Sequence, residues 1–566
     1  MSISFDAPQE AQTILAVEDL EVSYGMTSVL RSFSFTLHHG ERLAVVGESG
    51  SGKSTAIGAV LGLLPPGGHI THGQVRYRGQ DLTAADETQF RALRGRSIAL
   101  IPQDPMTNLN PTMRVGDQIA DALRASGMKG RREVIARVEA LMAEAGIPEP
   151  ARRRRQYPHE FSGGMRQRVL IAIALAGEPD LIIADEPTSA LDVTVQKQIL
   201  DHLEELVAQR AMALLFVTHD LGVAADRTDT ILVMSRGEVV ERGTPRQVLG
   251  APQHAYTRQL VAAAPVLPAA PSATASVAPS AGPAEHRPTD VHRDQPSSSP
   301  TPVDAPEPVL EVRNLVKDFT LRGQRTSLRA VDHVSFAMDR GTTTAVIGES
   351  GSGKSTLARI ALGLDEPTSG EVFLGGQSMS SGSRADRKAL RRFTQPVFQD
   401  PYTSLNPYWT IESVIREPLR LFRIGDRTEQ RRRVRDVLGR VALSQEILVR
   451  HPGELSGGQR QRVAIARALV SEPELLICDE AVSALDVLVQ AQVLELLTEL
   501  RAQMGVSCLF ITHDLAVAAD FSDDVVVMKQ GRLIEAGHTE QVISRPEAEY
   551  TRSLVDAMPG RGLAGV

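Results

Sequence analysis

Cysteine is nearly absent from this chain, and its scarcity argues against several kinds of site. The 566 residues include two cysteines, Cys478 and Cys508. Neither belongs to a cluster with metal-ligand spacing, so the sequence gives no support for a disulfide, a zinc site or an iron–sulfur cluster and fits a reducing compartment. Both lie in apolar runs of strand character, so we expect buried, unreactive thiols.

Long apolar runs and an excess of positive charge are also missing. No stretch of about 18 uncharged apolar residues occurs, so the sequence predicts no membrane span. Residues 1–12 have no basic start followed by an apolar segment, so we expect no secretory signal. The formal net charge is -8, which gives no global electrostatic case for nucleic acid as a partner. We therefore expect a cytoplasmic protein. This expectation allows it to work at a membrane through other chains that span it.

The length and composition indicate several globular domains. Hydrophobic residues make up 42% of the chain and charged residues 23%, which is ordinary for a soluble globular protein. One stretch, residues 264–307, is dominated by Ala, Pro, Ser, Thr and Asp and cannot bury enough apolar surface to offset the cost of ordering it. We interpret it as a flexible linker between a first domain at 13–263 and a second at 308–558.

The two predicted domains are copies of each other. Motif residues recur at one constant interval in the later part of each copy, so that Asp185 and Asp479 are as far apart as His219 and His513. Each copy alternates apolar strands with helical patterns, which is typical of an α/β domain with a largely parallel sheet. The mainly helical stretches 115–155 and 411–450 predict a separate helical lobe in each copy.

A phosphate-binding loop of the pattern G-x-x-x-x-G-K-[ST] occurs twice, each time after an apolar strand at 42–46 or 343–347. Its glycines let consecutive N–H groups point at negative charge, its lysine reaches the terminal phosphates, and its serine hydroxyl can ligate Mg²⁺. Two copies in this context predict two nucleotide sites. The residues expected at these loops are Gly47, Glu48, Ser49, Gly50, Ser51, Gly52, Lys53, Ser54 and Thr55, and Gly348, Glu349, Ser350, Gly351, Ser352, Gly353, Lys354, Ser355 and Thr356.

An apolar strand in each half ends in two acids, Asp185-Glu186 and Asp479-Glu480. Paired carboxylates at the carboxyl end of a buried strand suit the ligand crevice of an α/β sheet. The first acid can hold Mg²⁺ through water, while the second can orient and deprotonate an attacking water. The alternative is an exposed strand end with solvated acids, which the upstream phosphate loop disfavours in both halves.

A serine and two glycines precede a helical run upstream of each acid pair. These are Ser162, Gly163 and Gly164, and Ser456, Gly457 and Gly458. Such a helix start can bind a second anion. Because one domain needs only one such site for its own triphosphate, the second indicates that each half clamps the nucleotide held by the other.

Together these motifs resemble, over almost the whole of both halves, the nucleotide-binding domains of ABC transporters. The resemblance covers the Walker A loops, the Walker B acids, the signature sequences, the D-loops at 189–192 and 483–486, the Q-loop glutamines Gln103 and Gln399, and the switch histidines His219 and His513. It implies two tandem P-loop NTPase domains, each with a RecA-like core and a helical lobe. It also implies ATP as substrate, hydrolysed at both sites.

The resemblance implies a role for each matched residue. Glu186 and Glu480 would be the catalytic bases, with the two histidines at the γ-phosphate. The implied Mg²⁺ ligands are Ser54, Gln103, Asp185, Ser355, Gln399 and Asp479. In one composite site Lys53, Ser54, Gln103, Asp185, Glu186 and His219 would face Ser456, Gly457 and Gly458, and in the other Lys354, Ser355, Gln399, Asp479, Glu480 and His513 would face Ser162, Gly163 and Gly164.

Three positions bear on how closely the sequence matches the family: two aromatic residues and one departure in a signature sequence. Tyr24 and Phe319 stand where the family stacks an aromatic ring on adenine, the alternative being aromatic rings of the core. Met165 replaces the usual glutamine of the signature. Since the serine and glycines beside it are intact, we expect that site to stay active.

Several details resemble the peptide/nickel branch of ABC importers. Both Q-loops continue into an extension of that type, at 103–111 and 399–407, and a short tail follows each ATPase core at 252–260 and 546–554. The tails resemble the histidine–proline–tyrosine tail of the branch, with Ala255 and Glu549 at the proline position and Ala548 in place of the histidine in the second copy. They lack the cysteine cluster of some members.

The resemblance implies an ATPase that energises two membrane permeases fed by an extracytoplasmic binding protein, located at the cytoplasmic face of the membrane. The cargo stays open between di- or oligopeptides, glutathione, nickel–chelator complexes and peptide antibiotics. The rival is a soluble tandem ABC ATPase acting on ribosomes or nucleic acid. Against it, the linker is rich in Ala and Pro rather than a charged helical arm, and there is no basic groove. Arginine runs at 152–155 and 431–433 fit a solvated helix face, the alternative being contact with lipid headgroups or a permease loop.

Overall fold

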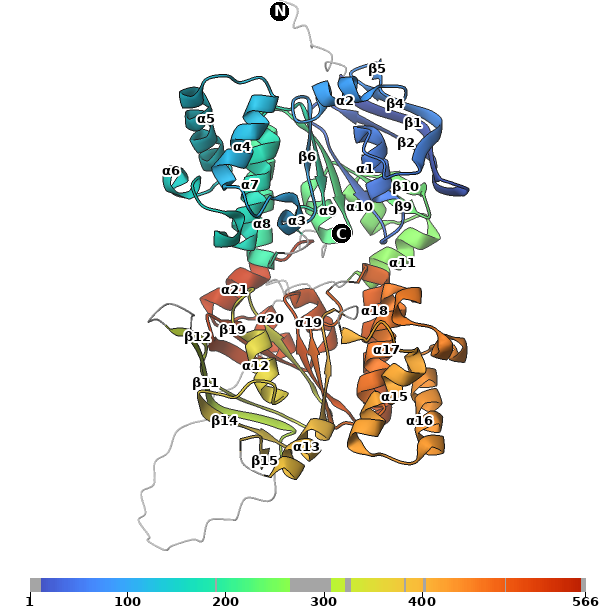
Figure 1. Ribbon diagram of the computed structural model, residues 1–566, viewed down its shortest axis with the longest axis vertical. Helices are drawn as coiled ribbons and strands as arrows, with labels where there is room; N and C mark the ends of the chain where they lie inside the picture. Colours follow the sequence, from blue (N-terminus) through green and yellow to red (C-terminus); the bar gives the residue numbers. More distant parts are fainter. Residues whose placement is uncertain are drawn as a thin grey trace, which may run out of the picture.

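The computed structural model describes residues 12–188, 191–264, 307–320, 327–380, 383–400, 404–483 and 485–560. Almost all of the predicted linker at 264–307 lies outside these residues, as do Ser189, Ala190 and Ala484 of the D-loops. The described residues form two similar halves stacked along the long axis of the molecule, the first above the second in Figure 1. The predicted class, two tandem α/β P-loop domains, is confirmed.

Each half opens with an antiparallel sheet in which long strands alternate buried and exposed residues. Such alternation lets one face pack on the core while the other meets solvent. The strand orders are β2-β1-β4-β5 and β12-β11-β14-β15. The bounds are β1 Thr13–Tyr24, β2 Thr27–His38, β4 Gly68–Tyr77 and β5 Gln80–Asp81 in the first half, and β11 Leu310–Thr320, β12 Ser327–Met338, β14 Ser369–Leu374 and β15 Gln377–Ser378 in the second.

A larger, mainly parallel sheet follows in the order β10-β9-β3-β8-β7-β6, and in the second half β16-β17-β18-β13-β19-β20. Its central strands are almost wholly apolar and buried, because helices and the antiparallel sheet cover both faces. The bounds are β3 Arg42–Val46, β6 Ile98–Ile101, β7 Leu181–Asp185, β8 Ala213–Thr218, β9 Thr230–Ser235 and β10 Glu238–Gly243, and then β13 Thr343–Ile347, β16 Thr394–Val397, β17 Leu475–Asp479, β18 Ser507–Ile511, β19 Asp524–Lys529 and β20 Arg532–His538.

The strand register gathers the predicted site at one edge of this sheet. Val46, the last residue of β3, pairs with Thr218 at the end of β8, and Asp185 at the end of β7 pairs with Val217. Because these strands are parallel, the segments that follow them emerge together. The phosphate loop, the acid pair and the switch histidine of each half therefore lie side by side.

The helical lobes begin where the sequence predicts, at Val115 and Ile411. In α4, Val115, Ile119 and Leu123 form a buried stripe that packs into the same core as the signature helix α7. The described helices between β6 and β7 are α3 Pro105–Asn108, α4 Val115–Ala125, α5 Arg131–Glu144, α6 Pro150–Arg153, η1 Pro158–Glu160 and α7 Gly163–Leu175, and those between β16 and β17 are α15 Ile411–Phe422, α16 Arg427–Arg440, η2 Gln445–Val449, η3 Pro452–Glu454 and α17 Gly457–Leu469.

The arginine runs in the lobes find carboxylate partners close by. Arg154 pairs with Glu139 at 2.8 Å, and Arg433 with Glu429 at 2.9 Å. These ion pairs agree with a solvated, salt-bridged helix surface.

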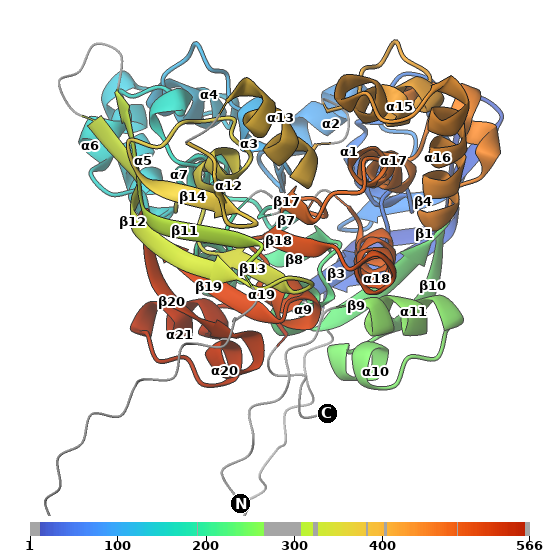
Figure 2. The ribbon, with the colours of Figure 1, turned by 90° about the horizontal axis from the view of Figure 1, so that it is seen from below.

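The remaining helices cover the sheets and form a tail after each core. The bounds are α1 Lys53–Leu61, α2 Glu87–Leu93, α8 Val193–Gln209, α9 Leu221–Arg227, α10 Pro245–Gly250 and α11 Ala255–Ala263, and α12 Lys354–Ala361, α13 Arg384–Phe393, α18 Val487–Met504, α19 Leu515–Phe521, α20 Thr539–Ser544 and α21 Glu549–Asp556. Figure 2 shows the lobe helices α4 and α15 on one side of the molecule and the tail helices α10, α11, α20 and α21 on the opposite side.

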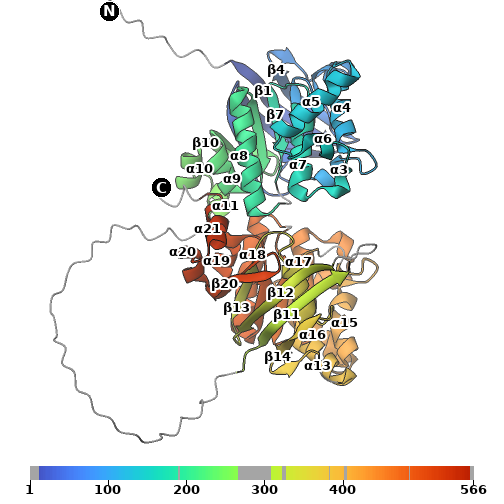
Figure 3. The same cartoon turned by 90° about the vertical axis from the view of Figure 1, so that its left-hand side faces the viewer.

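The halves meet through these tails in a reciprocal arrangement. Leu488 of α18 packs against the core of the first half's tail, and Val193 of α8 packs against that of the second. Figures 1 and 3 place α21 beside α8 at the junction. The lobe of each half also lies over the antiparallel sheet of the other, so the halves are arranged head to tail (Figures 1 and 2).

The two cysteines lie on adjacent strands of the second sheet. Cys478 in β17 and Cys508 in β18 are buried and free, with their sulfur atoms 3.8 Å apart. The neighbouring thiol of Cys508 and burial raise the pKa of Cys478, which keeps it protonated and unreactive. The prediction that both thiols are buried is confirmed.

Candidate active site

Each phosphate loop passes into its helix through a glycine in the left-handed conformation. Gly52 and Gly353 precede α1 and α12 with φ of 105° and 103°. A Cβ on Gly52 would lie 2.7 Å from Leu30 Cδ2, and one on Gly353 would lie 2.4 Å from the carbonyl oxygen of Ala330. At Gly353 both the left-handed backbone and the nearby carbonyl oxygen favour glycine, whereas at Gly52 the backbone conformation is the stronger reason, because the close atom ends a side chain.

The lysine of each loop folds back over its own backbone. Lys53 Nζ donates to the carbonyl oxygens of Gly47 at 2.7 Å and Glu48 at 2.9 Å, and Lys354 Nζ makes the same two bonds in the second half. Burial lowers the pKa of both lysines, an effect that nearby carboxylates oppose. A cation in so poorly solvated a place is well prepared to pair with phosphate.

The proposed catalytic glutamates have an unusual backbone conformation. Glu186 and Glu480 follow the ends of β7 and β17 with φ of 44° and 49°. Their N–H groups donate to carbonyl oxygens of the neighbouring strand, Val217 at 2.8 Å and Ile511 at 3.0 Å. Left-handed conformations of non-glycine residues are costly and are concentrated at functional sites. Here the conformation is held by the adjacent strand.

Each glutamate is bonded from two sides. Gln103 Nε2 donates to Glu186 Oε2 at 2.8 Å, and His219 Nδ1 lies 3.2 Å from Glu186 Oε1. In the second half Gln399 Nε2 donates to Glu480 at 2.6 Å, and His513 Nδ1 lies 3.6 Å away. Sequence motifs that are far apart in the chain therefore meet at one carboxylate in both halves.

These contacts shift the pKa values of the pair in opposite directions. Burial alone would raise the pKa of Glu186, but the hydrogen bond and charge of His219 outweigh it, so that the pKa is lowered. The hydrogen bond from Glu186 raises the pKa of His219. The same directions hold for Glu480 and His513. The pair therefore favours an anionic glutamate beside a protonated histidine.

A pH-dependent stability follows from the two histidines. Their stabilising contribution is complete below the ordinary histidine pKa of about 6.5 and is lost as the pH rises through the raised folded value. We expect His219→Gln with His513→Gln to lower the melting temperature most near pH 6, with the difference from wild type shrinking toward pH 9. Thermal unfolding across this range tests it, and His72→Gln, an exposed position on β4, is the control. A difference that does not vary with pH would contradict the ion pair.

The residues expected to hold Mg²⁺ have suitable chemistry. Ser355 Oγ donates to Asp479 Oδ1 at 3.2 Å, which places the hydroxyl and carboxylate oxygens of a hard-cation site together. Burial and the neighbouring Glu186 raise the pKa of Asp185 to about 6. A divalent cation would relieve this crowding of negative charge, so the donor set fits Mg²⁺.

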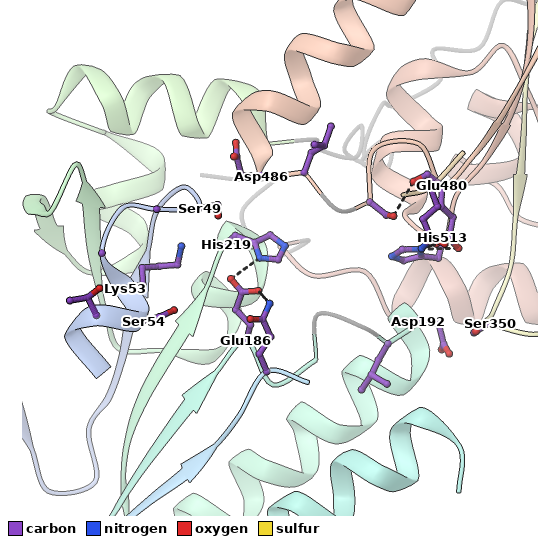
Figure 4. Close-up of a pocket in the computed structure, with 18 of the residues that line it drawn as sticks. Ser49, Lys53, Ser54, Glu186, Asp192, His219, Ser350, Glu480, Asp486 and His513 are labelled. Atoms are coloured by element: carbon purple, nitrogen blue, oxygen red, sulfur yellow. Dashed lines mark hydrogen bonds and ion pairs between the residues drawn. The ribbon is translucent and has the colours of Figure 1, made fainter. Parts of the chain in front are cut away.

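One pocket of about 860 Å³ joins the two sites and is lined by both halves. Figure 4 shows Asp486 of the second half on the side of Ser49 and Lys53, and Asp192 of the first half on the side of Ser350. The charge of Asp486 acts on Lys53, and that of Asp192 acts on Lys354. Each half therefore contributes an acidic residue to the site of the other.

The pocket brings together fifteen of the predicted site residues, which is fewer than half of them. The lining of the pocket includes Ser49, Gly50, Gly52, Lys53, Ser54, Thr55, Gln103, Glu186, His219, Ser350, Lys354, Ser355, Gln399, Glu480 and His513. The signature residues, the two aromatic rings, the acids Asp185 and Asp479 and the other predicted loop residues do not line it. Tyr24 packs tightly on Gly68, and Phe319 is partly exposed with Lys317 over its ring at 5.1 Å. Their contacts with ATP remain predictions.

The signature serines cap their helices. Ser162 Oγ accepts from Met165 N–H at 3.4 Å, and Ser456 Oγ accepts from Gln459 N–H at 3.3 Å. Gln459 returns a bond, since its Oε1 accepts from Ser456 N–H at 3.0 Å, a capping box that the methionine of the first half cannot form. The methionine at position 165, where the family has glutamine, therefore lacks one local hydrogen bond, while Ser162 still caps the helix.

Sequence reasoning placed the D-loops but missed Asp192 and Asp486 as members of the other half's site. Each caps the helix that follows, accepting from Val195 and Val489 N–H at 3.1 Å. Their fixed distance from the acid pair in both halves was the available signal. Val29 of β2 also lines the pocket, and nothing in its sequence context indicates this.

Two duplicated P-loop domains, with Walker, Q-loop, D-loop and switch residues gathered at one pocket, define the ATP-binding subunit of an ABC transporter. The family model described as ABC transporter matches residues 30–189 and 331–483, and the one described as oligopeptide/dipeptide transporter, C-terminal region, matches 240–290. The chain belongs to the ABC transporter family. It is an ATP-hydrolysing subunit of an ABC importer of the peptide type, rather than an ATPase acting on ribosomes or nucleic acid.

Two relatives that match nearly the whole chain agree with this assignment. The glutathione import ATP-binding protein GsiA of Shigella dysenteriae serotype 1 is 43% identical over 97% of this chain and 90% of its own length. GsiA of Escherichia coli strain K12 is 42% identical over the same shares. A solved structure of cbiO1 from Clostridium perfringens is 30% identical, covering 43% of this chain and 92% of that one, with a TM-score of 0.38.

Among the described residues, none of the helices combines the length and the apolar character that a membrane span requires.

Proposed function

We propose that the chain hydrolyses ATP at two composite sites and transmits the resulting closure to membrane permeases. The observation that carries this proposal is the shared pocket, in which Asp486 faces the loop of Lys53 and Asp192 faces the loop of Lys354. In each site the phosphate loop binds the triphosphate. The signature serine of the other half belongs to the lobe that lies over this half. It completes the site as the halves close.

The chemistry assigns a task to each side chain. Lysine and the loop N–H groups bind the β- and γ-phosphates. Ser54 with Asp185, and Ser355 with Asp479, would hold Mg²⁺, and the bound cation would neutralise charge on the phosphate oxygens. Glu186 and Glu480, kept anionic by histidine, accept a proton from the attacking water.

The cargo we propose is glutathione or a small peptide of similar size. This rests on the relatives, which are named for glutathione import, and on the tail that matches the oligopeptide/dipeptide family model. We further propose that the protein lies at the cytoplasmic face of the membrane, bound to two permeases that receive cargo from an extracytoplasmic binding protein.

Exposed apolar side chains beside the Q-loops support a permease surface. Met106 of α3 is 63% exposed, and Tyr408 and Trp409, just before α15, are 87% and 37% exposed. All three follow a Q-loop glutamine that touches a catalytic glutamate. They lie in the segments leading into the lobes, which are on the side of the molecule opposite the tails (Figure 2). A permease helix docked there would sense the state of the site.

Purification of the chain from its native membrane in mild detergent tests the proposal. We expect two permeases to be recovered with it, and the binding protein of the same system to bind glutathione or small peptides by calorimetry. Recovery with ribosomes or nucleic acid and without permeases would overturn the transport role, while a binding protein selective for another solute would overturn the cargo.

The docking surface gives a separate prediction. Tyr408→Glu should reduce permease recovery at least about tenfold, because it places a charge in an apolar contact. Leu328→Glu, on an exposed residue of β12, is the matched control. Equal recovery of permeases with both variants would place the contact elsewhere.

A further inference from the structure

A tyrosine from each tail reaches the phosphate loop of its own half. The hydroxyl oxygen of Tyr256, in α11, accepts a hydrogen bond from the backbone N–H of Glu48 at 3.1 Å. Tyr550, in α21, does the same for Glu349 at 3.2 Å. Burial raises the pKa of each tyrosine to about 12, so both hydroxyls stay protonated at neutral pH. The contact is therefore a neutral hydrogen bond present in both halves.

The bonded residue is the second of the phosphate loop, and it is held on its other side as well. The carbonyl oxygen of Glu48 accepts from Lys53 Nζ at 2.9 Å and from Ser51 N–H at 3.1 Å. Its N–H points to the tyrosine instead of the pocket. The peptide units on both sides of this residue are thus fixed, by the tail on one side and by the loop's own lysine on the other.

We infer that Tyr256 and Tyr550 are positioning residues that set the conformation of the two phosphate loops for ATP. Neither ring lines the pocket, so they act through the loop backbone and not on the nucleotide. The inference rests on the proposed ATP sites. It adds the tails to the elements that hold the phosphate loops of these sites in place.

The tails are anchored so that the tyrosines are presented in one position. Glu241 of β10 accepts from the N–H groups of Gln253 at 2.8 Å and His254 at 2.9 Å, where the tail begins. Glu535 of β20 accepts in the same way from Glu547 and Ala548. The anchor uses backbone N–H groups, which explains why the second tail keeps its place although alanine replaces the histidine.

Each tail also contacts the other half at the helix that follows its D-loop. Tyr256 and Leu488 of α18 pack against one cluster, and Val193 of α8 packs against the cluster that contains Tyr550. On the second side Thr194 Oγ1 also donates to the carboxylate of Glu349 at 2.9 Å. Each tail therefore packs on its own phosphate loop and on the D-loop helix of the other half, and on the second side that helix also contacts the loop directly.

The test replaces the hydroxyl and keeps the ring. Tyr256→Phe with Tyr550→Phe, in the full chain, should raise the KM for ATP roughly five- to tenfold, the loss expected for one hydrogen bond, while changing kcat less than about twofold. Hydrogen exchange should become faster in the peptide at 47–52 without a change in the peptide covering α11. Tyr77→Phe is the matched control, because Tyr77 is also buried and bonds Asp180 and Ser97 far from the loop.

The outcomes separate this inference from the proposed sites. An unchanged KM and unchanged loop exchange would overturn the positioning role. A rise in KM that the Tyr77 variant shares would also overturn it, since a general loss of packing would then be the cause. If Lys53→Ala with Lys354→Ala fails to weaken ATP binding in the wild-type background, the proposed sites themselves are wrong.

Discussion

Replacing Glu186 and Glu480 together with glutamine should stop ATP turnover and leave ATP binding intact. The amide keeps the size of the side chain but cannot accept the proton of an attacking water. General-base catalysis contributes about 10²- to 10⁴-fold, so we expect steady-state hydrolysis to fall at least about 100-fold. The affinity for ATP should change little, because phosphate is bound by the loop. Phosphate release and equilibrium nucleotide binding measure the two effects.

Glu238→Gln, at a side chain more than half exposed on β10, is the control for this variant. It should hydrolyse ATP at the wild-type rate. The single variants add information, because each removes one base and leaves the other site complete. Near-normal hydrolysis by the double variant would exclude both glutamates from the catalytic role.

Loss of the loop lysines should act on binding instead. Lys53 and Lys354 are buried and make two charge-assisted bonds each with backbone carbonyls, which phosphate oxygens would replace as partners. Such bonds are worth about 1.5–3 kcal/mol each, so Lys53→Ala with Lys354→Ala should weaken ATP binding by roughly 100-fold or more. Binding of a fluorescent ATP analogue at equilibrium provides the measurement.

The matched control is Lys197→Ala, which removes a part-exposed lysine paired with Asp201 on α8. The melting temperature of the double variant should not fall, because removing a poorly solvated charge offsets the lost bonds. Affinity within about twofold of wild type would contradict the assignment of both loops.

The motifs themselves could be read from the sequence because they specify local backbone. The glycines before Lys53 and Lys354, the apolar strands ending in acid pairs and the lobes starting at Val115 and Ile411 all depend on residues close together in the chain. The fold class followed from their order. The family resemblance placed Gln103 and Glu186 in one site. They follow β6 and β7, and the parallel register of these two strands brings them together.

Contacts between distant segments were beyond this reasoning. Glu48 and Tyr256 are 208 residues apart, and no spacing rule connects a tail to a loop that it must pack against. The entry of Asp192 and Asp486 into the opposite site depends on how the two halves stack. Adenine contacts at Tyr24 and Phe319 and phosphate contacts at Ser162 and Ser456 remain predictions.

The sequence by itself determined that this protein has two phosphate loops, two acid pairs and two switch histidines, because short-range backbone geometry and side-chain chemistry are encoded in consecutive residues. Only the tertiary structure decided which groups surround each loop. Long-range packing of the tails and D-loop helices buries apolar residues such as Leu488 and Val193 at the junction. No local pattern encodes that burial. It brings the aspartate of the other half, and the tyrosine of the half's own tail, to each phosphate loop.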